Sequence, residues 1–288
     1  MNLIAKLVAI SRLTRIEHSI MLAVAVVAAE LITGAGRLPP SVILVLSMLA
    51  PIFASMSAFA INDYLDIEAD RANKKPRPLV TKELKPVTAL YTTGITAIAA
   101  LALSAFINIE CFAITLLFST VSLLYSYGLK RLPLVGNAYV ALAMAIPFLF
   151  GNYATSPQLS PAIVVVFSMA FMSGLAREIH GTIRDYNGDV KARHANTLPV
   201  AIGKPASALL ALFLYIAAIA ASAWLYISFA PFSGNAAYAL LIGICDLAFA
   251  YVGIGFVMVP KQKFYDSTRN VSLGAMALAI LAILMASL

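Results

Sequence analysis

Charged residues are scarce in this chain. Only 11% of its 288 residues are Asp, Glu, Lys or Arg and 61% are hydrophobic, whereas about a quarter of the residues in a soluble domain are charged. This composition excludes an ordinary soluble domain. Histidine and cysteine are rarer still: the three histidines show no ligand spacing such as HxxxH and the two cysteines no metal-type spacing, so a zinc site is not indicated. The chain has no Ser/Gly-rich linker, which predicts one domain over residues 1–288.

What the chain has instead is a series of long apolar segments. About 20 consecutive apolar residues are enough for a helix to cross the hydrocarbon core of a bilayer. We therefore predict an all-α integral membrane protein with nine transmembrane helices. The expected spans are residues 16–35, 41–61, 87–107, 109–127, 134–152, 161–181, 205–230, 236–258 and 270–287.

The basic residues test this helix count. Lys and Arg concentrate in cytoplasmic loops, and nine spans with the N-terminus inside place 19 of the 20 basic residues on the cytoplasmic side, leaving only Arg37 outside. We expect a multi-pass protein of the cell membrane with an external C-terminus. The net charge of +7 is then mostly a signal of topology and gives no reason to propose a nucleic-acid partner.

Acidic residues are few and clustered. Six of the thirteen fall in two polar loops, in the runs Asn62-Asp63-x-x-Asp66-x-Glu68-x-Asp70 and Asp185-x-x-x-Asp189. Carboxylate oxygens are the ligands that Mg²⁺ prefers, usually together with substrate phosphates. We call Asn62, Asp63, Asp66 and Asp70 the first acidic motif, Asp185 and Asp189 the second acidic motif, and all six candidate metal ligands. A Mg²⁺-bound diphosphate is the first hypothesis.

The spacing of the acids inside the two motifs supports the hypothesis of a Mg²⁺-bound diphosphate. If the second span continues as a helix, Asn62, Asp66 and Asp70 lie along one face, and the second acidic motif repeats the i, i+4 spacing. Each motif is also followed fourteen residues later by a Lys-Pro pair, at 85–86 and 204–205. This internal repeat predicts two related polar loops on the same membrane face that close over a shared cavity. Ordinary solvated loop charges are the alternative.

Basic and aromatic residues near the loops complete the candidate site. Arg77, Lys130 and Lys191 are candidates for contacts with phosphate oxygens. Tyr125, at the end of a span, is either part of an interfacial aromatic belt or a ring whose π face steadies an allylic cation. His18, near the entry of the first span, is placed to touch the cavity.

Asp246 stands apart from these residues. It is the one clear carboxylate in the interior of a predicted span, and it is either functional or part of a helix–helix hydrogen bond.

On these residues the chain resembles the UbiA-type intramembrane prenyltransferases. The resemblance covers nearly the whole chain and rests on both acidic motifs and on the sequences around them: Asn73-x-x-Pro76-Arg77-Pro78-Leu79, Tyr125-Ser126, Leu129-Lys130-Arg131, Gly136-Asn137, Arg177-Glu178-Ile179 and Thr197-Leu198-Pro199. It implies nine helices around a central cavity capped by cytoplasmic loops. It also implies that both motifs bind Mg²⁺ and a polyprenyl diphosphate, with Asp66, Asp185 and Asp189 catalytic.

Within that family, the sequence around the second acidic motif resembles the archaeal digeranylgeranylglyceryl phosphate synthase branch. This implies transfer of a geranylgeranyl group from its diphosphate to geranylgeranylglyceryl phosphate. The chain departs from that branch at Gly181, Thr182 and Arg184, where the branch often has Lys, Asp and an acidic residue. The opening run from Arg15 to Ser19 resembles instead the members that prenylate an aromatic acid such as 4-hydroxybenzoate, so an aromatic acceptor is the alternative. A transporter and a non-catalytic membrane scaffold are remoter ones.

Overall fold

The computed structural model describes residues 3–72, 74–188 and 197–288, and all regular secondary structure in these ranges is helical. Nine of the described helices are long and apolar enough to cross a membrane, which confirms the predicted number of spans. They are α2 (Ile16–Thr33), α3 (Ser41–Leu65), α5 (Pro86–Ile107), α6 (Ile109–Tyr127), α7 (Val135–Thr155), α8 (Pro161–Gly188), α10 (Lys204–Ser228), α11 (Ala236–Met258) and α12 (Gln262–Ser287).

Four short helical elements accompany the spans. They are α1 (Leu3–Thr14), α4 (Ile67–Ala72), the 3₁₀ helix η1 (Leu129–Arg131) and α9 (Leu198–Ile202). None of them is among the predicted spans, because each is too short to cross a bilayer. Two of them, α4 and η1, carry residues of the candidate site.

Local sequence explains where the long helices begin and end. Pro86 and Pro205 lie in the first turns of α5 and α10, where proline fits because its missing N–H would have no helical partner. Asn108 ends α5 and caps α6, with its side-chain oxygen accepting a hydrogen bond of 2.8 Å from the backbone N–H of Cys111. One residue therefore makes the tight joint between two spans.

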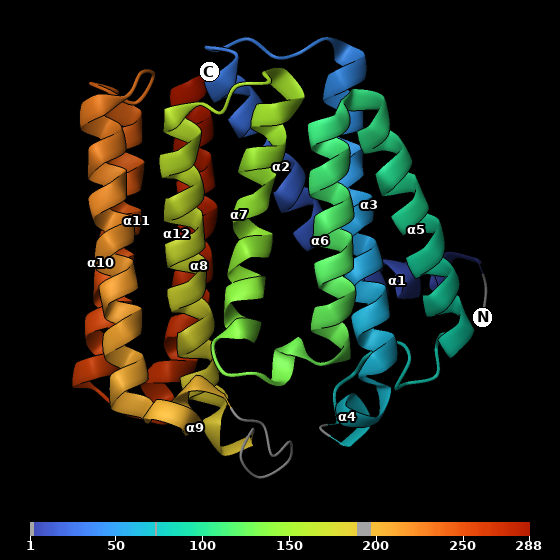
Figure 1. Ribbon diagram of the computed structural model, residues 1–288. Coiled ribbons are helices and arrows are strands. Elements are labelled where there is room, and N and C mark those ends of the chain that lie inside the picture. Colours follow the sequence, from blue (N-terminus) through green and yellow to red (C-terminus); the bar gives the residue numbers. More distant parts are fainter. Residues whose placement is uncertain (1–2, 73, 189–196) are drawn as a thin grey trace. The chain divides into compact units, whose positions relative to one another are not determined.

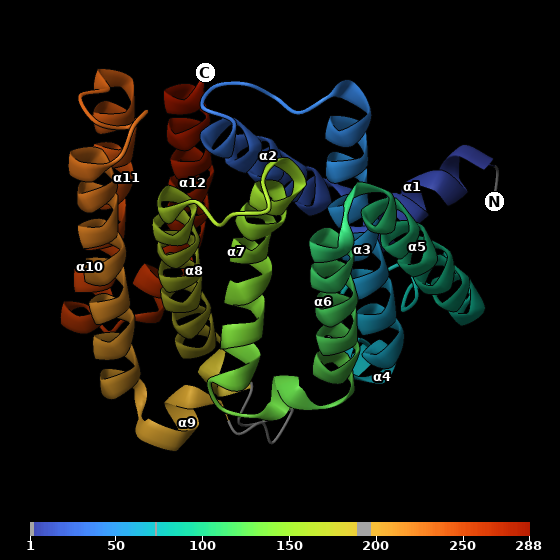
Figure 2. The same ribbon diagram turned by 45° about the horizontal axis from the view of Figure 1, so that its top comes forward.

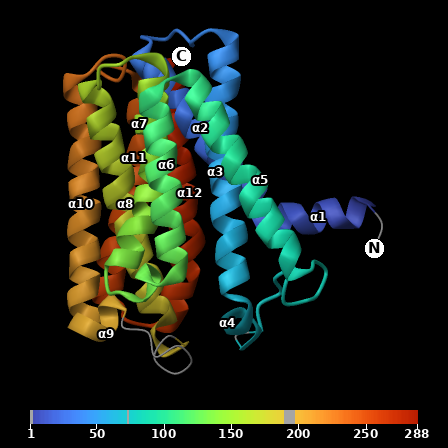
Figure 3. The same ribbon diagram turned by 45° about the vertical axis from the view of Figure 1, so that its right-hand side comes forward.

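The first compact unit comprises Met1–Val26 and Pro39–Leu129. In it α3 packs against α5 and α6, and α1 lies across the side of α3 (Figure 3). Ala9 and Leu13 of α1, Ala60 of α3, and Leu79 and Leu84 of the segment after α4 are buried together in a small apolar core. This core fixes α1 and the 74–85 segment beside the end of α3.

The second compact unit comprises Val27–Leu38 and Lys130–Leu288. Here α8 packs against α7 and α10, α11 against α10 and α12, and α12 returns to α8 (Figures 1 and 2). The short helix α9 contacts both α8 and α10. The single-domain prediction for residues 1–288 stays a prediction.

Apolar side chains cover the outside of the spans. In the most apolar 18-residue stretch of α5, for example, only 17% of the residues are buried, and Ile98 and Phe106 are exposed. A soluble protein buries such residues, whereas in a bilayer lipid tails cover them. The chain is a multi-span membrane protein.

Candidate active site

The first acidic motif lies at the junction of α3 and α4. The α3 helix ends at Leu65, and Asp66 interrupts it with φ −98° and ψ 6° before α4 begins. The backbone N–H of Asp66 still donates to the carbonyl of Asn62 at 3.0 Å, and that of Asp70 to the carbonyl of Asp66 at 2.8 Å. The predicted one-turn spacing of these three residues is therefore kept, although the helix is not continuous.

Asp63 lies outside the one-turn series of Asn62, Asp66 and Asp70, and its carboxylate contacts basic residues. Its side chain is 1% exposed, and Oδ1 accepts a hydrogen bond of 2.8 Å from an Nη of Arg15. Its other oxygen lies 4.0 Å from Nε of Arg77. The guanidinium of Arg15 also stacks over the ring of Phe59, 4.4 Å from its centroid. Asp63 therefore ties the joint between α1 and α2 to the end of α3.

The backbone of Arg15 adapts to this contact. Its φ is +48°, in the left-handed region that non-glycine residues seldom adopt, and it lies between the last residue of α1 and the first of α2. Burial lowers the pKa of the Arg15 guanidinium below its ordinary value, and the Asp63 carboxylate opposes that shift.

Asp70 is also buried and paired. Its carboxylate lies 2.9 Å from Nζ of Lys75 and 4.0 Å from Nε of Arg77. Arg77 thus stands between two carboxylates of the first acidic motif, with 31% of its side chain exposed. The neighbouring prolines at positions 76 and 78 restrict the backbone on both sides of it.

The segment that carries Arg77 is anchored to α1. Arg12 donates to Glu83 at 2.8 Å and to the carbonyl of Pro76 at 3.1 Å. The hydroxyl of Thr81 donates to Glu83 at 2.6 Å and holds the pKa of that carboxyl below its ordinary value, with Arg12 adding to the effect. These contacts, together with the burial of Leu79 and Leu84, fix the backbone of the 74–85 segment against α1.

The second acidic motif is held differently. Asp185, near the end of α8, is 58% exposed, and Arg184 next to it donates to both carboxylate oxygens at 2.9 and 3.1 Å. Gln262 at the start of α12 donates to the backbone carbonyl of Arg184 at 3.1 Å. Asp189 and Lys191 lie outside the described residues.

The remaining candidates occupy separate places. His18 is largely exposed, lies 3.4 Å from Glu17 and meets the ring of Phe59 edge-on at 6.0 Å. Tyr125 is half-buried in the last turns of α6. Lys130 is half-buried in η1, whose backbone runs so close to Gly136 that a Cβ there would lie 3.1 Å from the Lys130 carbonyl oxygen. A side chain at position 136 would therefore push this backbone contact apart by a few tenths of an ångström.

The structure thus brings together a cluster that sequence spacing predicts only in part. Asp63, Asp70 and Arg77 meet, as expected from their proximity along the chain, but Arg15 and Lys75 join them. The sequence indicates Lys75 only as a marker of topology, and Arg15 as a marker of topology and as part of the opening run from Arg15 to Ser19, so it predicts neither as a partner of these acids. The position of Arg15 just before a predicted span is the one feature of the sequence that could have suggested a role. That position does not predict which acidic residue Arg15 contacts.

The oxygen ligands of the first acidic motif fit a hard cation. In the part of the chain that the structure describes, no three Asp, Glu, His or Cys side chains form a metal site by themselves. Mg²⁺ does not need one, because it keeps several waters and binds through one or two carboxylates plus substrate phosphates. Asn62 and Asp66, half-buried and one turn apart, offer suitable oxygens.

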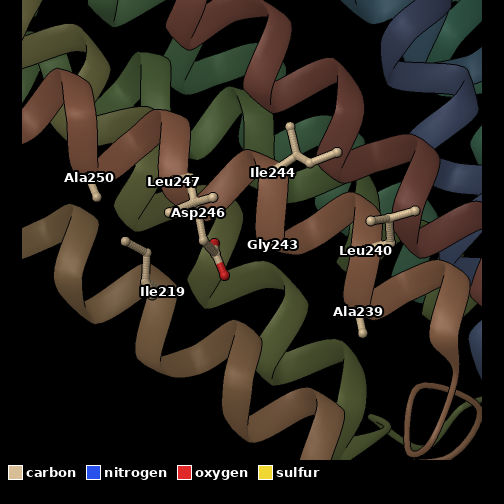
Figure 4. Close-up of a pocket in the computed structure, with 8 residues that line it drawn as sticks. All are labelled: Ile219, Ala239, Leu240, Gly243, Ile244, Asp246, Leu247 and Ala250. Atoms are coloured by element: carbon tan, nitrogen blue, oxygen red, sulfur yellow. The ribbon is translucent and has the colours of Figure 1, made fainter.

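Asp246 belongs to neither acidic motif. Its carboxylate accepts a hydrogen bond of 2.7 Å from the hydroxyl of Ser222 on α10. It lines a groove of about 540 Å³ together with apolar side chains of α10 and α11, among them Ile219 and Leu247. Figure 4 shows Asp246 among these side chains. Of the two alternatives for this residue, the structure shows the helix–helix hydrogen bond.

The chain matches one family model and several known proteins. Residues 21–263 match the model of the UbiA prenyltransferase family. The chain is 32% identical over 238 residues to digeranylgeranylglyceryl phosphate synthase of Archaeoglobus fulgidus, covering 82% of this chain and 81% of that protein. It is 30% identical over 246 residues to the synthase of Methanosphaera stadtmanae, covering 85% and 88%.

Solved structures show the same fold. A structure from work on digeranylgeranylglyceryl phosphate synthase in membranes has a TM-score of 0.82 and 28% identity, with 98% of both chains covered. A UbiA homolog from Archaeoglobus fulgidus bound to GPP and Mg²⁺ has a TM-score of 0.64 and 20% identity, with 96% of this chain and 99% of that one covered.

Proposed function

This chain belongs to the UbiA prenyltransferase family, and on that premise we propose that it transfers a geranylgeranyl group from geranylgeranyl diphosphate to geranylgeranylglyceryl phosphate. The supporting observation is that relatives of at least 30% identity over more than four fifths of the chain carry the name of this activity. The family match includes both acidic motifs. The product would be a lipid with a second ether-linked prenyl chain.

The acidic motifs bind the donor in this proposal. Mg²⁺ bound to the diphosphate supplies positive charge that stabilises the pyrophosphate as it leaves. Its proposed ligands are five of the six candidates, namely Asn62, Asp66, Asp70, Asp185 and Asp189, whereas the sixth, Asp63, is paired with Arg15. Arg77, Lys130 and Lys191 neutralise phosphate oxygens that the metal does not bind.

The bond between C1 of the prenyl chain and the diphosphate oxygen breaks first, and its electron pair leaves with the pyrophosphate. The π face of Tyr125 steadies the allylic cation. The glyceryl hydroxyl then forms the new ether bond to C1, and its proton passes to Asp185, Asp189 or the released pyrophosphate. His18 contacts the substrates near the membrane surface.

The distribution of basic residues supports an orientation. We place the N-terminus and both motif loops on the cytoplasmic side of the cell membrane and the C-terminus outside. A long prenyl chain dissolves in the bilayer, so an enzyme embedded there meets its donor and its lipid acceptor in the same phase.

A transfer assay tests the proposal. Reconstituted protein receives radiolabelled geranylgeranyl diphosphate with geranylgeranylglyceryl phosphate or 4-hydroxybenzoate, with Mg²⁺ or with EDTA. We expect label in the glyceryl lipid alone, and none in EDTA. Label in the aromatic acid alone would favour the alternative acceptor, which the run from Arg15 to Ser19 suggests. Label in neither lipid nor acid would refute both.

A further inference from the structure

The pairing of Asp63 separates it from its neighbours in the first acidic motif. We propose that Asp63 is a positioning residue that holds Arg77 and Arg15 for anion binding, and that it is not a Mg²⁺ ligand. The ligand class is a phosphate or diphosphate group, and its identity as part of a prenyl donor rests on the function proposed above.

The Asp63 carboxylate is buried and already paired with basic residues. Its side chain is 1% exposed, one oxygen is bound by Arg15 at 2.8 Å and the other lies 4.0 Å from Nε of Arg77. A Mg²⁺ ion needs a nearly octahedral shell of oxygen ligands and gives up its waters reluctantly. Reaching Asp63 would require breaking a buried ion pair and leaving the Arg15 guanidinium, which is only 21% exposed, without its carboxylate, which is costly. Asp70 differs because its close partner, Lys75, is 40% exposed, so water can solvate that ammonium group when the carboxylate binds a metal.

The direction of the Asp63 side chain also supports a role other than metal binding. Asn62, Asp66 and Asp70 follow one another at intervals of one helical turn. Asp63 is one residue out of this row and therefore points about 100° away around the helix axis. That direction leads to Arg15 at the joint of α1 and α2, 48 residues earlier in the chain.

In this arrangement Arg77 is the side chain positioned to bind the anion. Its Nε lies 4.0 Å from Asp63 and 4.0 Å from Asp70, so both carboxylates lie near one part of the guanidinium. In both ion pairs the atom of Arg77 that approaches the carboxylate is Nε, not a terminal amino group. Because a guanidinium binds phosphate oxygens through paired N–H groups, the other edge of Arg77 is suited to an anion.

The local charge also favours an anion. Three cationic side chains, Arg15, Lys75 and Arg77, meet the two carboxylates Asp63 and Asp70. The cluster keeps an excess of positive charge although it lies inside an acidic motif. Asp63 is thus a counter-ion that lets two guanidinium groups lie near each other despite their repulsion.

The test separates metal binding from anion binding. Asp63→Asn and Asp66→Asn are each measured for inorganic pyrophosphate affinity in EDTA and for the Mg²⁺ concentration that gives half-maximal transfer. We expect Asp63→Asn to weaken metal-free pyrophosphate binding about tenfold or more, since small misplacement of a binding group has effects of this size, and to leave the Mg²⁺ half-saturation unchanged. Asp66→Asn should show the reverse pattern.

Matched controls guard against general effects. Glu68→Gln removes one negative charge from the exposed side of α4 and should change neither quantity. If Asp63→Asn does not fold, Asp63→Glu, which keeps the charge and shifts the carboxylate, takes its place. Arg77→Gln should reproduce the loss of pyrophosphate binding, and adding Asp63→Asn to it should cause little further loss.

The outcomes are distinct. A rise in Mg²⁺ half-saturation for Asp63→Asn equal to that for Asp66→Asn, with metal-free pyrophosphate binding intact, would overturn the proposal. Failure of wild-type protein to transfer a prenyl group would instead refute the proposed function, and the pyrophosphate measurements in EDTA would still decide the role of Asp63.

Discussion

The two acidic motifs share a spacing but differ in how their carboxylates are held. In the first, Asp63 and Asp70 are buried and paired with basic residues from other segments, one of them 48 residues away. In the second, Asp185 is 58% exposed and paired with its own neighbour, Arg184. The spacing therefore predicts the type of ligand, whereas packing decides which carboxylate is available to a metal.

Loss of an acid in either motif is expected to have the largest effect. Asp66→Ala or Asp185→Ala should each lower kcat/KM for Mg²⁺-dependent transfer by about a thousandfold or more, because the metal supplies several kcal/mol of charge stabilisation. Steady-state transfer assays measure this, and circular dichroism checks that helix content is kept. Full activity in both variants would remove the basis for a shared chemical role.

The ion pairs of the two motifs should differ in their contribution to stability. Arg15→Ala leaves the buried Asp63 without its closest partner, and we expect a loss of about 3–5 kcal/mol. Arg184→Ala breaks a pair whose carboxylate, Asp185, is 58% exposed and stays in contact with water, for which we expect about 0–1 kcal/mol. Denaturation in detergent, followed by circular dichroism, compares the two variants directly. Equal losses would contradict the contrast in burial.

Release of Asp185 from Arg184 should change metal dependence modestly. Arg184→Gln leaves the Asp185 carboxylate to the metal, so the Mg²⁺ concentration for half-maximal transfer should fall about two- to fivefold, the range that a surface ion pair allows. A Mg²⁺ titration of transfer measures the shift. A higher Mg²⁺ requirement would show that Arg184 itself assists substrate binding.

The smallest expected effect concerns the segment that carries Arg77. The pKa of Glu83 is lowered by Thr81 and Arg12, so its contribution to stability is present above its ordinary value of 4.5 and is lost as the pH falls through its lower folded value. Glu83→Gln should lower the melting temperature slightly at neutral pH, and the difference should disappear in acid. A difference that persists at low pH would assign the effect to packing instead of charge.

Much of the fold is readable from hydropathy. The predicted spans 109–127 and 236–258 coincide with α6 and α11, and 87–107 differs from α5 by one residue. The α12 helix begins at Gln262, eight residues before the predicted 270, because polar residues at its start are helical without being apolar. The α1 helix was not predicted, because Lys6 and Arg12 interrupt its short apolar run.

The site is less readable than the fold. The acids of the first acidic motif are visible in the sequence as a cluster, and their one-turn spacing persists past Asp66. The pairing of Asp63 with Arg15 depends on how α1 crosses α3 and on a left-handed backbone at Arg15, and neither follows from local sequence. Long-range ion pairs are set by tertiary packing.

The most direct test of the account compares two products of one reaction. Reconstituted protein is given geranylgeranyl diphosphate, geranylgeranylglyceryl phosphate and Mg²⁺, and released pyrophosphate is counted against newly formed ether lipid by mass spectrometry. The account predicts one pyrophosphate for each new ether bond, and neither product in EDTA. Pyrophosphate released without the ether lipid would mean that water, not the lipid hydroxyl, captures the prenyl group, and would contradict the assignment as a lipid prenyltransferase.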